Sequence, residues 1–213
     1  MAQPFRLVAG DSAPVQQTST TCGSASLAVA RMLRDPALAR WVRDGVHPLG
    51  VVADPRDPGT PTGRFAAYEQ VVAARTNAVL GAGSRPQLPW PRALGTPPWG
   101  ARRELEHGAA DPGTPYGVGW LRTRGPAGLA REYAALRTRV RPGAPALLYV
   151  GNAWAPRHVV LVLPAAGAAA AGLVVYEPSI GRVVDLDEAA FTSRTLRLGG
   201  WDVPWLTVQP GPH

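Results

Sequence analysis

The first half of the chain places its apolar residues in runs with helical spacing, separated by polar segments. Within residues 20–35, nearly every position after Cys22 is apolar or small, which predicts a buried helix with Thr20 or Thr21 as its N-cap. The other helices that this periodicity predicts cover residues 36–45, 63–79 and 125–143, with a short charged helix ending at His107.

Two long segments between these helices are too rich in proline and glycine for regular structure. Residues 46–62 contain Pro, Gly and Asp throughout, which predicts a loop. Residues 81–100 contain several prolines together with Trp90 and Trp99. Because proline rings stiffen the chain and tryptophan side chains favour burial, we expect an ordered loop that packs on the rest of the protein.

The C-terminal third has a different pattern, in which short runs of Val, Leu and Tyr are bounded by Gly and Pro. These runs predict strands over residues 144–151, 157–164, 172–178, 182–186 and 203–210, with a hairpin connection at 165–172. Helices followed by consecutive antiparallel strands predict an α+β fold. We expect one domain over residues 1–213, with a helical part at about 14–143 and a sheet part at about 144–210.

The composition narrows the class of protein. With one cysteine among 213 residues, the chain can form no intramolecular disulfide and no zinc site of the Cys-x-x-Cys type. The net charge is +7, but the 22 basic residues are all arginines, scattered without the interleaved aromatic residues of a nucleic-acid-binding surface. The sequence has no signal-peptide pattern and no membrane-spanning run. We therefore expect a cytoplasmic protein that binds neither membrane nor nucleic acid, and secretion without a signal peptide stays open.

The single cysteine, Cys22, lies where polar residues give way to the first buried helix. A thiolate is the reactive form of cysteine, and the dipole and free N–H groups of a helix N-terminus favour negative charge. The neighbouring Gly23 would leave room for a substrate backbone. This placement suits a nucleophile, whereas the ordinary alternative is a buried structural thiol.

A nucleophilic cysteine needs a base, and His158 is the best placed of the four histidines. It opens a predicted strand, so the sheet would hold its ring beside a cleft. Glu177 ends the next strand, where its carboxylate could fix the tautomer of the imidazole if the two strands pair. Gln16 or Gln17 could donate an amide hydrogen to an oxyanion. Taken singly, each of these residues also has an ordinary explanation as a structural or solvated side chain.

Together these residues resemble the papain-like cysteine peptidases. The matching segments are "QQTSTTCGSASL", "HVVLV" and "VVYEPSIGRV", and the likeness spans about residues 14–34 and 144–192. The branch that the chain resembles most is the group of peptidases that process bacteriocins with double-glycine leaders. The middle of the chain has no counterpart in this resemblance.

The resemblance implies a role for each of four side chains. Cys22 would be the nucleophile, His158 the base and Gln16 the donor in the oxyanion hole. The orienting residue would be Glu177, in a turn where family members usually carry Asp or Asn. The glutamate departs from this pattern. Its side chain is one methylene group longer than that of Asp or Asn, and the turn must accommodate that group.

The function that this implies is a thiol hydrolase that needs no cofactor or metal. It would cleave a peptide or isopeptide bond in a peptide or protein substrate through a Cys-His-Glu triad. The same groups could deamidate glutamine or transfer an acyl group, also in a toxin-like effector, and a non-catalytic interaction module is the second alternative. We expect residues 81–100, including Trp90, and Trp154 in the loop before His158 to border the substrate groove.

Overall fold

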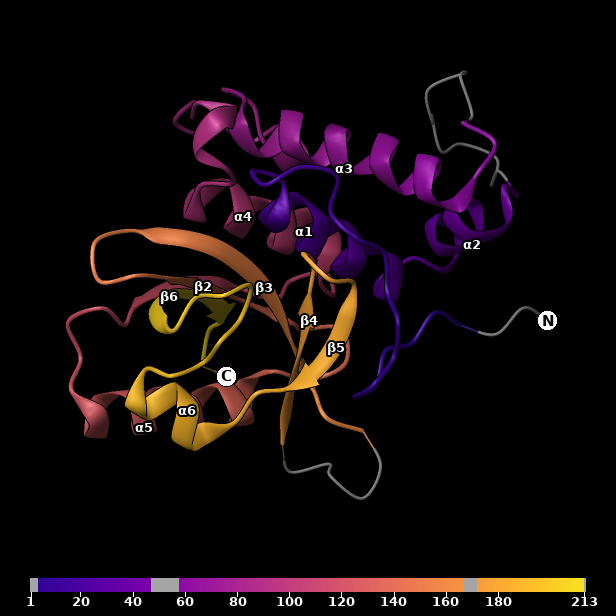
Figure 1. The fold of residues 1–213 in the computed structure, drawn as a ribbon. Coiled ribbons are helices and arrows are strands. Elements are labelled where there is room, and N and C mark those ends of the chain that lie inside the picture. The colour runs from indigo at the N-terminus through magenta and orange to yellow at the C-terminus, as the bar shows by residue number, and fades with distance from the viewer. Residues whose placement is uncertain (1–3, 47–57, 167–171, 213) are drawn as a thin grey trace.

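The computed structural model describes residues 4–46, 58–166 and 172–212. Within these ranges the chain forms a six-stranded antiparallel sheet with helices on both faces (Figure 1). The α+β class predicted from the sequence is therefore confirmed. Most of the predicted loop 46–62 and of the hairpin connection 165–172 lies outside the described residues.

The strands occur in the sheet in the order β1-β6-β2-β3-β4-β5, and neighbouring strands are antiparallel. Their bounds are β1 Tyr116–Trp120, β2 Ala146–Gly151, β3 Pro156–Pro164, β4 Leu173–Glu177, β5 Arg182–Asp185 and β6 Val203–Pro210. The five predicted strands are all present. The sheet also contains β1, which comes from the part of the chain that we expected to be helical.

The main helices follow the predicted order. They are α1 Cys22–Arg34, α2 Pro36–Asp44, α3 Pro61–Asn77, α4 Pro98–Glu104, α5 Pro126–Arg139 and α6 Glu188–Ser193. Three shorter turns are η1 Ala82–Ser84, η2 Arg92–Leu94 and η3 Leu105–Ala109. The predicted charged helix is thus split between α4 and η3, and α6 was not predicted.

The sheet separates two hydrophobic cores, because successive side chains of a strand point to opposite faces. On one face, Leu147 and Leu161 pack with the buried sides of α1, α2 and α3. On the other face, Leu148 and Val160 pack with α5 and α6. Helices α1–α4 and helices α5–α6 accordingly lie on opposite sides of the sheet in Figure 1. The helical part of the chain does not form a single layer as expected, since α5 crosses to the far face.

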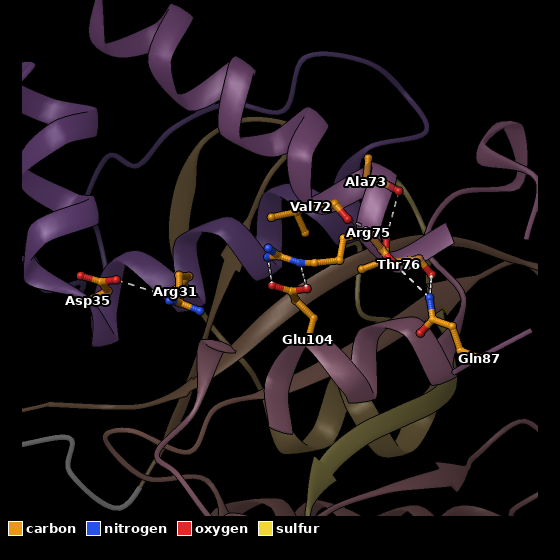
Figure 2. Close-up of polar contacts among 8 residues, drawn as sticks. All are labelled: Arg31, Asp35, Val72, Ala73, Arg75, Thr76, Gln87 and Glu104. Atoms are coloured by element: carbon orange, nitrogen blue, oxygen red, sulfur yellow. Dashed lines mark hydrogen bonds and ion pairs between the residues drawn. The ribbon is translucent and has the colours of Figure 1, made fainter. Parts of the chain in front are cut away.

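The proline-rich segment 81–100 is ordered because polar groups at the end of α3 hold it. The Gln87 amide donates to the carbonyl oxygens of Arg75 and Thr76, at 3.0 and 2.9 Å, and so satisfies the last turn of α3 (Figure 2). Nearby, the buried Glu104 carboxylate of α4 pairs with the Arg75 guanidinium, and Arg75 Nε donates to it at 2.7 Å. These contacts tie α3, α4 and the segment between them into one unit.

Candidate active site

Cys22 is the first residue of α1, and its side chain is 5% exposed. Helix α1 is buried along most of its length, so its start is held rigidly against the sheet. The Ser26 hydroxyl, one turn into the helix, donates to the Val159 carbonyl oxygen of β3 at 3.3 Å. That contact joins the element carrying Cys22 to the strand carrying His158.

His158 lies near the start of β3, opposite Val150 of β2, and it is 6% exposed. Its Nε2 donates to Oε1 of Glu177, the last residue of β4, at 2.6 Å. The backbone of Gly199 covers the ring so closely that a Cβ there would lie 2.7 Å from His158 Cδ2. The imidazole is therefore fixed in one orientation.

The Glu177 carboxylate is buried and well supplied with donors. Besides His158, the backbone N–H and the hydroxyl of Ser179 donate to its Oε1, at 2.9 and 2.8 Å. Burial alone would raise the pKa of Glu177, but these hydrogen bonds and the charge of His158 lower it overall. The carboxylate is thus stabilised in its ionised form, and the additional methylene of glutamate is accommodated in the turn.

The Cys22 thiol is the other hydrogen-bonding partner of His158. Because Nε2 is engaged by Glu177, the ring nitrogen left for Cys22 is Nδ1. Burial would lower the pKa of His158, but the interactions with Cys22 and Glu177 outweigh it and raise the pKa to about 9. The structure thus places the His158 ring between Glu177, to which it is hydrogen-bonded, and Cys22, which contributes to its raised pKa.

The loop that carries Gln16 is attached to the turn after β4. The backbone N–H of Gln16 donates to the Pro178 carbonyl oxygen at 2.9 Å, one residue after Glu177. The Gln16 side chain donates one amide hydrogen to the Thr18 carbonyl oxygen at 2.7 Å, which leaves its second amide hydrogen available. The Gln17 side chain donates instead to the Val15 carbonyl oxygen, at 3.2 Å.

Glu69 of α3 supports this loop, and the sequence analysis did not identify it. Its carboxylate is fully buried and accepts the backbone N–H of Gln17, at 3.2 and 3.3 Å, while the Thr21 side chain also hydrogen-bonds to it. Burial raises the pKa of Glu69, although both hydrogen bonds oppose that shift. The signal in the sequence is one glutamate on an otherwise apolar helix stretch, "FAAYEQVV", which is the pattern of a buried and hydrogen-bonded acid.

Gly23 packs closely against Thr96. A Cβ at position 23 would lie 2.6 Å from Thr96 Cβ, so the missing side chain makes room for Thr96, and the predicted contact with a substrate backbone stays a prediction. The neighbouring Ser24 hydroxyl shares a hydrogen bond with the Thr96 hydroxyl at 3.2 Å. The Tyr149 hydroxyl donates to the Thr96 carbonyl oxygen at 3.0 Å. Residue 96 is therefore packed against the start of α1.

The tryptophans that we expected at the substrate groove have different environments. Trp90 packs edge-to-face on Trp99, with ring centroids 5.2 Å apart, and both rings are partly buried. This pair stabilises segment 81–100 from within, and Trp90 is not among the residues lining the cavity described next. Trp154 is 87% exposed in the loop before β3, four residues from His158, so its side chain is free to meet a substrate.

A cavity of about 210 Å³ opens beside the start of α1. Its walls are the threonines of residues 18–21, Ser24 of α1 and one face of α3, and it is closed by Arg92 and Gly95 of segment 81–100. Part of that segment therefore borders a cavity at the start of α1, and its contact with a substrate stays a prediction. The residues of the segment that do so are Arg92 and Gly95.

Across the described ranges, no three His, Cys, Asp or Glu side chains gather where they could hold a metal ion. None of the helices in those ranges is long and apolar enough to cross a bilayer.

A scan against protein-family models and a search of the curated proteins give no match to this chain. A search of the solved structures finds the crystal structure of the Pseudomonas avirulence protein AvrPphB, with 14% sequence identity and a TM-score of 0.46. The similarity extends over 92% of this chain and 95% of that chain. At an identity and a TM-score this low, the likeness carries no argument about the fold or the function of the protein.

Proposed function

We propose that the protein is a thiol hydrolase of the papain-like kind that cleaves a peptide or isopeptide bond. The observation that carries this proposal is the chain of contacts from the buried Glu177 carboxylate through His158 to the Cys22 thiol. A structural cysteine has no need of an oriented imidazole and a buried carboxylate behind it. Burying an imidazole and a carboxylate together costs desolvation free energy, and a catalytic role accounts for their burial.

In the proposed reaction, His158 takes the proton of Cys22, and the thiolate attacks the carbonyl carbon of the scissile bond. The negative charge that develops on the carbonyl oxygen is stabilised by the Cys22 backbone N–H and the free amide hydrogen of Gln16. His158 then gives its proton to the leaving amine as the C–N bond breaks, which leaves a thioester on Cys22. A water molecule, deprotonated by His158, attacks the thioester and regenerates the thiol.

Glu177 holds the imidazole in position and stabilises its charged form throughout this cycle. The raised pKa of His158, about 9, favours the imidazolium that must donate to the leaving amine. Trp154, exposed near the start of β3, is a candidate contact for the substrate.

Deamidation of glutamine and acyl transfer to an amine use the same first step and differ only in the substrate and the acceptor. These outcomes, including action as an effector on proteins of another cell, are therefore variants of one mechanism. A non-catalytic interaction module would keep the fold without turnover. Its chemistry differs from all the others, because it needs no reactive thiol.

The first experiment measures the reactivity of Cys22. Because the chain contains one cysteine, the rate of alkylation by iodoacetamide reports on Cys22 alone. At about pH 6, we expect the His158→Gln variant to react at least roughly ten-fold more slowly than the wild type, since the thiolate loses its cationic partner. His107→Gln is the matched control, and it should react like the wild type.

The second experiment identifies the reaction. A peptide library derived from a proteome is incubated with the wild type and with Cys22→Ser, and the products are read by mass spectrometry. New termini that depend on Cys22 indicate a peptidase, and glutamine converted to glutamate indicates a deamidase. No Cys22-dependent product, together with equal alkylation rates in the wild type and His158→Gln, would overturn the proposal in favour of an interaction module.

A further inference from the structure

The cavity beside Cys22 has a position and a lining that the proposed reaction does not explain. Thr21 and Ser24 both line it, and they flank Cys22 along the start of α1. Cys22 itself is not among the lining residues, so whatever fills the cavity lies against the neighbouring residues of the same helix start. Its volume, about 210 Å³, is large enough for an amino-acid side chain.

Most of the residues that line the cavity are polar, whereas a pocket for an apolar side chain is lined predominantly by hydrophobic residues. Threonine and serine hydroxyls and the amides of Gln70 and Asn77 face it, and Ala73 is the apolar residue among those that line it. Of the described residues that line the cavity, Arg92 is the one that carries a charge. Hydroxyl groups and a guanidinium are the donors that suit a carboxylate.

Arg92 is free to take an anionic partner. It is exposed, and within the described residues no carboxylate forms an ion pair with it. Other arginines near the same helices already form salt bridges. Arg75, for example, pairs with Glu104 (Figure 2). A ligand carboxylate could therefore satisfy the Arg92 guanidinium without breaking an existing contact.

The backbone around Arg92 is held in place before any ligand arrives. The Asn77 side-chain amide, at the end of α3, donates to the Gly95 carbonyl oxygen at 2.9 Å and to the Trp90 carbonyl oxygen at 3.2 Å. The Gln87 amide fixes the preceding part of the segment to α3. The backbone that carries Arg92 therefore needs no reordering when a ligand meets the guanidinium.

Glu69 is the acidic group closest in sequence to the cavity wall, next to Gln70. Its carboxylate is fully buried and engaged with the Gln17 backbone N–H and with Thr21. Burial also raises its pKa, which favours the neutral form. Glu69 therefore leaves the charge of Arg92 available at the mouth of the cavity.

We propose that this cavity is a specificity pocket for a carboxylate of the substrate, with Arg92 as its counter-ion. The proposal deepens the proposed function and rests on it, since the cavity opens at the start of the helix that carries Cys22. The carboxylate belongs either to an aspartate or glutamate side chain or to the C-terminus of a peptide. The test separates these two sources.

The test measures binding without turnover. Cys22→Ala protein is immobilised and exposed to heptapeptide libraries with randomised positions, one library acetylated and amidated, the other with free C-termini. Enriched sequences are read by mass spectrometry, and affinities of the best peptides are measured in solution. We expect Arg92→Gln to weaken binding roughly ten-fold, as for a lost charge-assisted hydrogen bond. Arg92→Glu should shift the preference to basic residues.

Arg85→Gln, an exposed arginine of the same segment outside the cavity lining, is the matched control and should bind like the parent protein. Enrichment of Asp or Glu at one position of the blocked library, lost in Arg92→Gln, indicates an acidic side chain. Enrichment confined to free C-termini indicates a terminal carboxylate. Absence of any carboxylate preference that depends on Arg92 overturns the proposal.

Failure of this proposal and failure of the proposed function give different results. Cys22-dependent cleavage without an Arg92-dependent preference would support the proposed hydrolase and contradict the proposed specificity pocket. If carboxylate binding depends on Arg92 but no reaction depends on Cys22, the proposed hydrolase is contradicted. The protein would then be a carboxylate-binding module.

Discussion

Two buried carboxylates hold the segments that carry the proposed catalytic groups. Glu177 fixes the imidazole of His158, and Glu69 fixes the loop that leads to Cys22. The two differ in their partners, because Glu177 meets a cation whereas Glu69 meets a backbone N–H and the Thr21 side chain. In the proposed mechanism, Glu177 therefore affects proton transfer, and Glu69 affects the geometry of the proposed oxyanion hole.

Replacing Glu69 should therefore affect the proposed oxyanion hole more than the nucleophile. In Glu69→Ala the Gln17 backbone N–H loses its acceptor, so the loop carrying Gln16 becomes less ordered. We expect the affinity for a peptide aldehyde, which forms an oxyanion-like adduct on the thiol, to fall roughly ten-fold. The rate of alkylation by iodoacetamide, which needs no oxyanion hole, should stay near the wild-type value.

Glu69→Gln supplies the control for this prediction, because an amide oxygen can still accept the Gln17 N–H. It should recover most of the aldehyde affinity. Equal losses of aldehyde affinity and alkylation rate in Glu69→Ala would instead show a general disturbance of α1, and Glu69 would have no specific positioning role.

At the scale of single residues, the sequence located Cys22, His158 and Glu177 because each lies at the end of an element that the hydrophobic pattern delimits. The contacts of Gly23 and Glu69 depend on neighbours that are distant in the sequence. Gly23 faces Thr96, and Glu69 faces Gln17. No local pattern specifies such partners, so the packing of Thr96 on Gly23 was not foreseen and Glu69 was not found.

Among the elements, segment 81–100 is the one whose order depends most on a few hydrogen bonds. Few of its residues between Pro86 and Leu94 are in regular structure, and Asn77 and Gln87 supply its links to α3. The Trp99 indole N–H adds a bond to the Leu88 carbonyl oxygen at 2.8 Å. The prolines of segment 81–100 also limit the conformations that it can adopt in the unfolded chain.

Asn77→Ala should loosen this segment while the rest of the protein stays folded. Trypsin can cleave after Arg92, which precedes Ala93, whereas the proline after Arg85 hinders cleavage there. We expect the rate of cleavage after Arg92 to rise several-fold in Asn77→Ala, measured by mass spectrometry under native conditions. Val71→Ala, an exposed position on the same helix, is the control. An unchanged cleavage rate in Asn77→Ala would mean that Gln87 and the tryptophan pair hold the segment without Asn77.

The elements that the sequence analysis missed lack a clear signal. Strand β1 has the sequence "YGVGW", in which two glycines weaken the strand pattern. Its pairing with β6 specifies it, and Gly119 has no room for a side chain beside the Thr207 hydroxyl. Helix α5 was predicted correctly, but an amphipathic pattern does not state which face of a sheet a helix covers.

On the scale of the whole molecule, the contact between His158 and Glu177 links stability to pH. The pKa of His158 is raised from 6.5 to about 9 in the folded state, so its contribution to stability is complete below pH 6.5 and is lost as the pH rises through about 9. The pKa of Glu177 is lowered, so its contribution is present above its ordinary value and is lost on acidification. The pair therefore favours stability at mildly acidic to neutral pH.

Urea unfolding at several pH values tests this linkage. Between about pH 6.5 and 9.5, the wild type should lose on the order of 3 kcal/mol of unfolding free energy through His158, since one pKa unit corresponds to about 1.4 kcal/mol. His158→Gln should show a much flatter dependence over the same range. Parallel curves for the two proteins would show that His158 has the same proton affinity in the folded and unfolded states.

The turn at 177–181 has to satisfy several contacts at once. Glu177 meets His158, the Pro178 carbonyl oxygen holds the backbone of Gln16, and Gly181 has a positive φ of 60° and no room for a Cβ beside the Ala13 carbonyl oxygen. A mutation that alters the length or shape of this turn would disturb both the proposed base, His158, and the proposed oxyanion donor, Gln16. In evolutionary terms, the turn can change only as a unit, whereas segment 81–100 touches the site mainly through Arg92 and Gly95 and can diversify around them. Relatives of this protein should therefore differ in substrate preference through that segment while retaining the turn.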